Sequence, residues 1–548
     1  LSCVWLLCLS SFLLGHGVWE LEASHHVYRE LQTFQSSPAT RPYRTAFHFQ
    51  PPKNWMNDGA GGGNKTWGHS TSVDLINWIP HKPAIVPSQL YDSFGCWSGS
   101  ITFLPGDKPV ILYTGIINSQ NWQVQNLAVP NNLSDSYLVD WVKSPRNPLM
   151  APTPQNQIDP GSFRDPSSAW LGPDGTWRVI IGNGRSDVGM ALLYRSRDFV
   201  EWTKAENPLH FSEGSKMWEC PDFFPVSKIS SNGVDTPVFG FEVKRVLKAS
   251  FLGHDYYATG TYKLENDIFI LDKGTLNSSS LRYDYGNFYA SKTFFDSSNS
   301  RRILWGWVLK ATDGNINTMK GWAGLQSFPR KVWLDKAGNQ LTQWPVKEIL
   351  KLRTKKVEKP RQALNGGSVR EISGITAAHA DVDIAFEVSN FEKAELLDPS
   401  WTDPQLLCAL KNASVNSGGL GPFGLLVLAS EGMQEYTAVF FRIFKDDTKF
   451  VVLMCSDQSR SSKMDYYKPT YGTFMDVDPV HQELSMRTLV NHSIVESFGG
   501  EGKACITARV YPTMAIGGGA SLYAFNNGSE SVTVSRFRAW SMKKAQIN

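Results

Sequence analysis

Three short acidic motifs in the first half of the chain contain the residue types that could do chemistry. They are Trp55-Met56-Asn57-Asp58, Phe163-Arg164-Asp165-Pro166 and Trp218-Glu219-Cys220-Pro221-Asp222. Cleavage of a glycosidic bond needs one carboxyl group to protonate the leaving oxygen. It also needs a second carboxylate that faces the charged sugar carbon, about 5–5.5 Å away if configuration is retained. The motifs are therefore candidates for glycosidase chemistry.

Each motif alone also has a purely structural explanation. Asp58 could cap a turn, and Glu219 could be a charge at a rim. Asp165 could do no more than pair with Arg164. Because the structural explanation is favoured for any single motif, the case for catalysis depends on the three together.

Composition excludes some classes of partner. The 548 residues include 54 Lys and Arg against 51 Asp and Glu, a net charge of +3, which gives no electrostatic reason to expect nucleic acid or an anionic membrane. Aromatic residues are abundant, with 19 Trp, 18 Tyr and 30 Phe. Aromatic faces bind sugars, but they also fill β cores, and the core explanation is preferred.

The first residues predict secretion. Residues 1–23 contain an uncharged apolar run with the length of a signal peptide, without the charged residues that normally precede it. No later segment has the roughly 18 apolar residues of a membrane span, so a secreted protein that does not cross a membrane is expected. Sequons for N-glycosylation, which support secretion weakly, occur at Asn64, Asn132, Asn277, Asn412, Asn491 and Asn527.

Short β-rich runs with turn residues between them dominate residues 42–345. Ser72-Val73-Asp74-Leu75-Ile76-Asn77-Trp78 and Ser196-Arg197-Asp198-Phe199-Val200-Glu201-Trp202 share one pattern, each after a β run. A recurring hairpin signature predicts radial repetition of blades, with coincidence in a sandwich as the alternative. Residues 346–365 are charged and predict a connector, and the alternating strands of residues 366–548 predict a β-sandwich.

Together and in this order, the acidic motifs resemble plant acid invertases and fructan exohydrolases of glycoside hydrolase family 32. The resemblance extends over almost the whole chain beyond residue 42, through the segments 43–52, 95–100, 283–292, 320–324, 454–457 and 495–500. It implies an all-β chain, a five-bladed β-propeller followed by a β-sandwich. It also implies retaining hydrolysis of terminal β-fructofuranosyl bonds, with no metal or other cofactor. Pro221 matches the cell-wall group.

The resemblance also implies roles for individual residues. Asp58 would be the nucleophile, Glu219 the general acid/base, and Asp165 the stabiliser of the transition state. The fructose subsite would be shaped by Trp55, Asn57, Trp97, Ser98 and Arg164. For Glu219 to hold a proton, we expect Trp218 and nearby carboxylates to raise its pKa, while Arg164 keeps Asp165 ionised.

One segment departs from the family pattern. Family members continue Asp-Pro-Asn-Gly after the nucleophile, then form an aromatic-rich strand with a fructose-contacting Gln. Here Asp58 is followed directly by the run Gly59-Ala60-Gly61-Gly62-Gly63. The loss of an inner part of the first blade would leave an unpaired strand edge and an unfilled core. A catalytically impaired sugar-binding relative is therefore the alternative to an active enzyme.

The loop over residues 249–257 bears on the substrate. Sucrose-cleaving relatives commonly carry an Asp and a nearby Lys just before the strand that begins His254-Asp255-Tyr256-Tyr257, where they help to hold the glucose unit. Here the loop is shorter, and that Asp and that Lys are absent. We therefore favour a fructan exohydrolase over a cell-wall invertase, although Phe251 and Leu252 could equally be packing residues. A fructosyltransferase is a third reading. By resemblance we expect a monomer in the apoplast or cell wall, with the vacuole as the alternative compartment.

Cysteine arithmetic and the resemblance together predict one disulfide. Cys3 and Cys8 lie in the expected signal peptide, which leaves five cysteines, an odd number, and no spacing of a zinc site. Cys455 and Cys505 lie in strand-like runs of the second unit, and related plant enzymes have a bridge at matching positions. We expect this pair to be bonded, and Cys96 and Cys220 to stay free.

Overall fold

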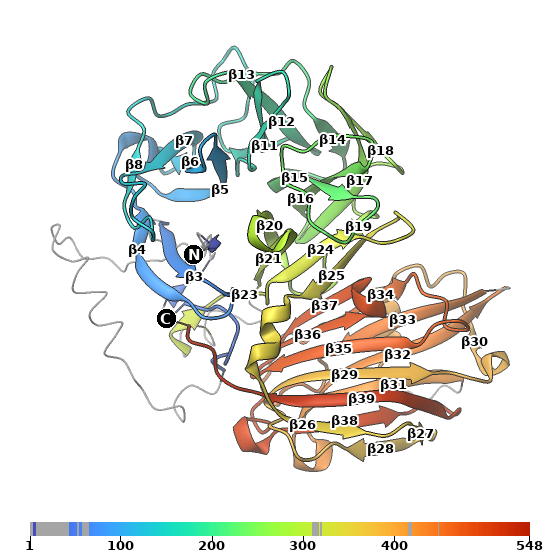
Figure 1. The fold of residues 1–548 in the computed structure, drawn as a ribbon. Helices are drawn as coiled ribbons and strands as arrows, with labels where there is room; N and C mark the ends of the chain where they lie inside the picture. Colours follow the sequence, from blue (N-terminus) through green and yellow to red (C-terminus); the bar gives the residue numbers. More distant parts are fainter. Residues whose placement is uncertain are drawn as a thin grey trace.

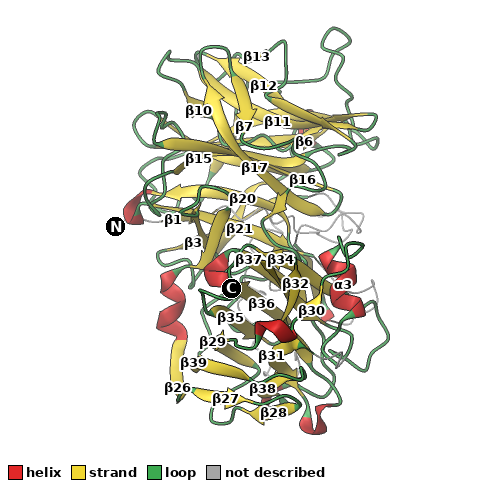
Figure 2. Ribbon diagram, turned by 90° about the vertical axis from the view of Figure 1, so that its right-hand side faces the viewer, coloured by secondary structure: helices red, strands yellow, loops and turns green. Residues whose placement is uncertain are grey.

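The computed structural model describes residues 4–6, 43–51, 54–56, 65–309, 317, 320–414, 419–447 and 449–547. Two β-rich bodies lie side by side, a propeller built from the first part of the chain and a two-layer sandwich built from the rest (Figures 1 and 2). The expected all-β class is confirmed. In the part of the chain that is described, no helix is both long enough and apolar enough to cross a membrane.

Five sheets form the propeller in chain order. The first contains β3 (Trp67–Ser72) and β4 (Ile79–Ile85), with β1 (Val4–Leu6), from the expected signal peptide, paired to β3. The second contains β5 (Cys96–Leu104), β6 (Lys108–Ile116), β7 (Gln123–Pro130) and β8 (Trp141–Lys143). The third contains β9 (Phe163–Arg164), β10 (Trp170–Leu171), β11 (Trp177–Arg185), β12 (Val188–Ser196), β13 (Thr203–Lys204) and β14 (His210–Glu213). The fourth contains β15 (Glu219–Ser227), β16 (Val243–Phe251), β17 (His254–Lys263), β18 (Ile268–Leu271) and β19 (Leu281–Arg282). The fifth contains β20 (Tyr289–Asp296), β21 (Arg301–Val308), β23 (Leu325–Gln326), β24 (Arg330–Leu334) and β25 (Leu341–Pro345).

The ring is closed by a strand from the start of the chain. β2 (Asn54–Trp55) pairs in parallel with β22 (Trp322–Ala323), next to the fifth blade. Just beyond β2, the Met56 amide donates to Ala323 O at 2.9 Å. The segment that enters the first blade is therefore anchored on the last blade.

The two copies of the repeated pattern fold into the same turn. Asp74 accepts hydrogen bonds from the amides of residues 76 and 77, and Asp198 accepts them from residues 200 and 201. Leu75 and Phe199 have positive φ angles of 61° and 67°, and both side chains are buried in their blades. The strain of that backbone is offset by the burial of the same side chain in each blade, so the prediction of a repeated blade unit is confirmed.

The predicted connector over residues 346–365 is wrong in its details. Residues Lys347–Leu352 form a short 3-10 helix, but Arg353–Lys359 (β26) and Gln362–Leu364 (β27) pair with β39 (Val532–Met542) as part of the sandwich. β26 is an edge strand, so its charged side chains stay in water. Pro360 lies between the two strands, where no ladder N–H is needed.

Two seven-stranded sheets form the sandwich. One contains β26, β27, β29 (His379–Glu387), β35 (Leu484–Asn491), β36 (Ile494–Gly499), β37 (Ala504–Arg509) and β39. The other contains β28 (Ser368–Glu371), β30 (Glu395–Leu396), β31 (Leu420–Ala429), β32 (Thr437–Asp446), β33 (Lys449–Asp457), β34 (Thr470–Met475) and β38 (Ser521–Asn526). Inward residues of both sheets share one core, in which the rings of Phe386 and Phe423 meet at 5.0 Å. Among the elements whose bounds the structure describes, the other helices are α3 (Pro404–Leu410) and single 3-10 turns at Leu90–Asp92, Ser297–Asn299, Phe391–Lys393, Glu431–Met433, Gly500–Gly502 and Gly517–Gly519.

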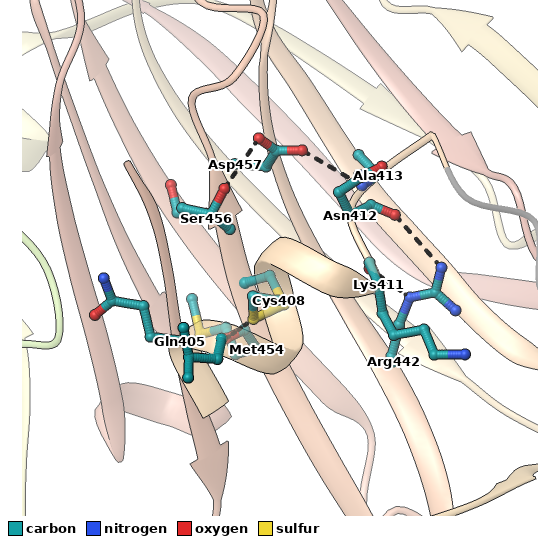
Figure 3. Close-up of a disulfide and its surroundings, with 12 residues drawn as sticks. Gln405, Cys408, Lys411, Asn412, Ala413, Arg442, Met454, Ser456 and Asp457 are labelled. Atoms are coloured by element: carbon teal, nitrogen blue, oxygen red, sulfur yellow. Dashed lines mark hydrogen bonds between the residues drawn. A yellow bond between two sulfur atoms is a disulfide. The ribbon is translucent and has the colours of Figure 1, made fainter. Parts of the chain in front are cut away.

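The predicted disulfide between Cys455 and Cys505 is wrong. Cys455 is bonded to Cys408 of α3, with the two Cα atoms 5.7 Å apart (Figure 3). Cys455 points to the outer face of its sheet, under α3, whereas Cys505 lies in the other sheet and packs in a cluster shared with the propeller. The two sulfur atoms therefore lie on different faces of the sandwich. Cys96 and Cys220 are free, as predicted, and Cys505 is free as well.

A fully buried charge network joins the propeller to the sandwich. Arg330 of the fifth blade lies 2.8 Å from Glu496 Oε1 of β36 and 2.9 Å from Asp284 Oδ2. The other Glu496 oxygen lies 2.8 Å from the ring of His48, which belongs to the segment before β2. Thr507 of β37 donates to Asp284. Three separate parts of the chain are thus fixed to one another by groups that have no access to water.

The network makes a prediction about stability. Glu496→Gln removes the charge between Arg330 and His48, so we expect the free energy of unfolding to fall by about 3–5 kcal/mol. Glu483→Gln, which alters a half-exposed ion pair of the same sheet, should cost less than about 1 kcal/mol. Thermal and denaturant unfolding of the three proteins measures both effects. Equal stabilities would contradict the assigned role.

The same network predicts a pH window. Burial raises the pKa of Glu496, but Arg330 and His48 outweigh burial and bring it from 4.5 to about 2. A depressed folded-state pKa gives stability that is complete above the ordinary pKa and is lost as the pH falls through about 2. The difference between the parent and Glu496→Gln should therefore persist at pH 5 and shrink between pH 4.5 and 2.

Candidate active site

Glu219, Trp97 and Ser98 lie where the first strand of a blade interrupts its ladder. The register shifts between Cys96 and Gly99 in β5, between Glu219 and Asp222 in β15, and between Tyr289 and Lys292 in β20. Such bulges bend a strand and redirect its side chains. The second, fourth and fifth blades thus each have an irregular backbone at the start of their first strand.

Glu219 is held by two donors from the neighbouring blades. Arg164 of β9 donates to Glu219 Oε1 at 2.6 Å, and the Tyr289 hydroxyl of β20 donates to Oε2 at 2.5 Å. The Glu219 side chain retains 31% exposure. A partly accessible carboxyl group with both oxygens bonded is suited to transfer a proton to or from a ligand, provided that one donor gives way or the proton is shared.

The expected rise in the pKa of Glu219 is wrong. Burial does raise it, but the charge of Arg164, the hydrogen bonds from Arg164 and Tyr289 and the charge of Lys248 outweigh burial, so the pKa lies below 4.5. Trp218 does not take part as expected, because its ring is fully buried in the core of the blades, stacked on Phe251. Neighbours in sequence on a strand point to opposite faces.

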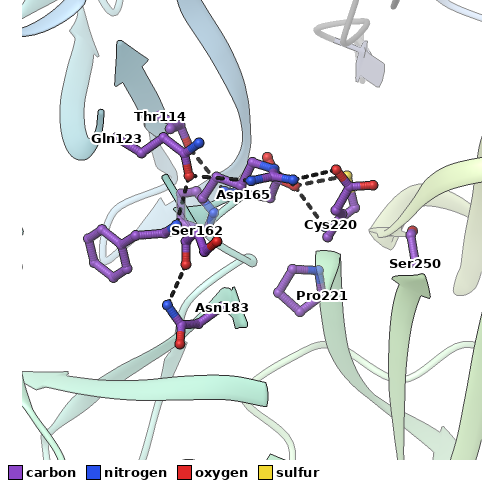
Figure 4. Close-up of polar contacts among 12 residues, drawn as sticks. Thr114, Gln123, Ser162, Asp165, Asn183, Cys220, Pro221 and Ser250 are labelled. Carbon is purple, nitrogen blue, oxygen red and sulfur yellow. Dashed lines mark hydrogen bonds and ion pairs between the residues drawn. The ribbon is translucent and has the colours of Figure 1, made fainter. Parts of the chain in front are cut away.

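Asp165 of the third blade is hydrogen-bonded to the fourth blade at Cys220, the residue after Glu219. Its Oδ2 accepts the Cys220 amide at 2.8 Å, and the Cys220 thiol lies 3.5 Å from the same oxygen (Figure 4). Asp165 is buried and has a positive φ of 66°, and its own amide donates to Thr114 Oγ1 at 2.9 Å. These bonds on both sides fix the backbone and the carboxylate of Asp165 in one orientation.

Arg164 connects the two carboxylates. Its Nε lies 4.0 Å from Asp165 Oδ2, farther than its contact with Glu219, so Glu219 is its main partner. Burial lowers the pKa of Arg164, but the negative charges of Asp165 and Glu219 outweigh burial and raise the pKa above its ordinary value. The guanidinium therefore stays charged. Gln123 of β7 accepts from Arg164 Nη1 at 3.4 Å and from the Phe163 amide at 2.7 Å. The second blade thus orients the arginine of the third.

Of the other predicted site residues, some lie among the described residues and some do not. Trp97 and Ser98 are half-buried at the shift in β5, and the Lys65 ammonium lies 4.2 Å from the Trp97 ring centroid. Asn57 and Asp58 lie outside the described residues, and only the backbone of Trp55 is described, in β2. The structure therefore brings together Asp165, Glu219 and Arg164.

Sequence reasoning missed the role of Tyr289. Its signal was present, because Tyr289 lies in the segment 283–292 that supported the resemblance, but no local pattern connects it with a glutamate 70 positions away. Metal chemistry has no evident ligand set here. Among the described residues, no three or more His, Cys, Asp or Glu side chains are grouped so that they could hold a metal ion.

The chain matches two family descriptions in succession. Residues 59–345 match the Glycosyl hydrolases family 32 N-terminal domain, and residues 348–541 match the Glycosyl hydrolases family 32 C terminal. It is similar to the beta-fructofuranosidase, insoluble isoenzyme CWINV1, of Arabidopsis thaliana, with 55% identity over 100% of this chain and 98% of that protein. It is also similar to the fructan 6-exohydrolase of Beta vulgaris, with 53% identity over 99% of this chain and 95% of that protein.

A solved structure agrees with these similarities. The crystal structure of fructan 1-exohydrolase IIa from Cichorium intybus superposes with a TM-score of 0.90 at 48% identity, covering 92% of this chain and 98% of that chain. Another crystal structure of that protein contains 1-kestose. The family descriptions cover most of the chain, and the relatives exceed half identity over nearly all of it. This chain belongs to glycosyl hydrolase family 32.

Proposed function

We propose that the protein hydrolyses terminal β-D-fructofuranosyl linkages with retention of configuration, and that fructan is preferred to sucrose. The observation that carries this proposal is the Glu219 carboxylate between Arg164 and Tyr289, one residue before the amide that binds Asp165. Membership of a glycosidase family supports the same chemistry. Arg164, Glu219 and Tyr289 belong to strands of the third, fourth and fifth blades.

In the proposed mechanism Glu219 protonates the leaving oxygen and later deprotonates water. Asp58 attacks the sugar carbon, and Asp165 binds fructose hydroxyl groups with an orientation fixed by the Cys220 amide. Arg164 and Tyr289 keep the free Glu219 ionised, so substrate must compete for its oxygens. Exclusion of water and the charge of Asp58 would then favour the protonated form in the complex.

The loop over residues 249–257 supports fructan as the substrate. β16 and β17 are joined directly by Leu252 and Gly253, both with positive φ, so the hairpin has no room for further polar side chains. Phe251 is buried against Trp218 and Tyr256, and it is therefore a packing residue. A site without polar partners for the glucose unit binds sucrose less well. A longer fructan can gain contacts with other parts of the protein.

Three other readings remain, and two of them have an observation in their favour. The Arabidopsis relative, by its name an insoluble beta-fructofuranosidase, favours invertase activity on sucrose. A fructosyltransferase would use the same residues with a sugar as acceptor. An impaired sugar-binding relative is favoured by the shortened first blade. The alignment with the Arabidopsis protein spans 579 positions, so at least 31 of them have no counterpart among the 548 residues here.

The relatives also bear on location. Several are named as insoluble or cell-wall enzymes, which supports a secreted protein of the cell wall or apoplast. We propose the same location for this protein and a monomeric state, with fructan or sucrose as its ligand.

Glu219→Gln tests the proposed acid/base. The change removes the ionisable group at nearly constant volume, so fructose release should fall by roughly 10²–10⁴-fold while the thermal unfolding curve is unchanged. Glu213→Gln, an exposed glutamate of the neighbouring blade, should retain full activity. If Glu219→Gln stays within twofold of an active parent, the assignment fails. A parent without any fructose release would favour the impaired reading.

Substrate preference is tested by kcat/KM on inulin-type fructan, levan-type fructan and sucrose. We expect at least one fructan to be preferred to sucrose. The reason is the short β16–β17 turn, which removes the polar side chains that would hold glucose. A clear preference for sucrose would instead identify an invertase.

Tyr289→Phe gives a pH prediction with a definite sign. The hydroxyl donates to the ionised form of Glu219 and so lowers its pKa, and the loss of that donor raises the pKa. Because the acid must be protonated, the alkaline limb of kcat/KM should move to higher pH. Tyr194→Phe is the matched control, since within the described structure its buried hydroxyl has no hydrogen-bond partner. An unmoved limb in Tyr289→Phe would contradict this role.

A further inference from the structure

The bulge that presents Glu219 leaves two backbone carbonyls without ladder partners. The pairing of β15 with β16 jumps from Glu219 opposite Ser250 to Asp222 opposite Lys248, so Cys220 and Pro221 face a single residue. Cys220 has a positive φ of 45°, and Pro221 has no amide hydrogen. Both residues are buried, and buried carbonyls require a donor from elsewhere.

Two lysine ammonium groups bond these carbonyls. Lys248 Nζ, fully buried in β16, donates to Cys220 O at 3.1 Å. Lys292 Nζ of β20 donates to Pro221 O at 2.9 Å, and it lies 3.5 Å from Pro166 O, directly after Asp165. Hydrogen bonds from a charged donor are about twice as strong as neutral ones. Lys292 therefore connects the backbone beyond Glu219 with the backbone beyond Asp165.

Lys248 also joins this bulge to the one that presents Tyr289. Its ammonium donates to Ser291 O at 2.7 Å and lies 3.3 Å from Asp255 Oδ2. The Asp255 carboxylate in turn accepts the amides of Ala290 and Ser291 at 3.1 and 2.8 Å. One buried ion pair thus bonds the free backbone groups of two neighbouring bulges.

We propose that Lys292 and Lys248 are positioning residues for the reaction, whose ammonium groups hold the Cys220–Pro221 bulge so that Glu219 stays aligned with Arg164, Tyr289 and Asp165. This inference rests on the proposed function of Glu219. The simpler explanation is that both lysines only stabilise the fold. The two explanations differ in their effect on the alignment of Glu219 in a protein that remains folded.

Lys292→Met carries the test, because Lys292 is half-buried and leaves no carboxylate of a buried ion pair behind. Misplacement of a catalytic group by about 1 Å can cost about 10²-fold. We expect kcat to fall by about 10–10²-fold at unchanged KM, and Lys292→Arg, which keeps a cationic donor, to recover part of it. Lys244→Met, the same change on the far part of β16 where Lys244 bonds Gly338 O, should stay within twofold of the parent.

A second readout separates alignment from stability. p-Nitrophenyl β-D-fructofuranoside has a leaving group that needs little protonation, so a misplaced acid should impair its hydrolysis less than that of fructan. Equal losses on both substrates, or a kcat of Lys292→Met within twofold of the parent, would overturn the proposal.

The crystal structure of Lys292→Met tests the inference without activity. The distance from the Cys220 amide to Asp165 Oδ2 is 2.8 Å in the parent, and we expect it to exceed hydrogen-bonding range in the variant. An unchanged distance would overturn the proposal whatever the activity. If the parent releases no fructose but the variant shows the displaced bulge, the proposed function fails while the structural role of Lys292 stands.

Discussion

Buried backbone groups that leave a β ladder must be bonded by something else, and this constraint shapes the centre of the propeller. The bulges in β15 and β20 turn Glu219 and Tyr289 toward each other, but they also free carbonyls and amides in a dry environment. Lys248, Lys292 and Asp255 supply the missing partners. The backbone that carries the candidate acid is therefore bonded by charged side chains other than the proposed catalytic groups.

The same principle operates between the two bodies of the molecule. Arg330 and Glu496 are costly to bury alone, yet together with Asp284 they fix the fifth blade on the sandwich. The fifth blade also carries Tyr289 and accepts the ring-closing strand. The sandwich thus fixes the blade that supplies Tyr289 to Glu219. The sandwich therefore supports the site without contacting it directly.

Local patterns were sufficient for the class of fold and for the motifs, because alternation, turn residues and short acidic sequences are properties of neighbouring positions. Interactions between blades were not predictable in this way. The pKa of Glu219 depends on Tyr289, 70 positions away, and on Arg164 from another sheet. The prediction of the disulfide partner of Cys455 was wrong for a related reason. The strand pattern of Cys455 resembles that of Cys505, and only the packed sandwich shows that Cys455 lies beneath α3.

The first blade bears on catalysis only as far as the contacts of the candidate residues depend on it. Glu219, Asp165, Arg164 and Tyr289 are positioned by the second to fifth blades, and none of their described contacts uses the first. The segment before Asp58 is fixed by the pairing of β2 with β22 and by the bond of the buried Met56 to Ala323 O. The described contacts that align Glu219 with Arg164, Tyr289 and Asp165 therefore do not depend on the first blade, and this argues for an enzyme over a sugar-binding relative.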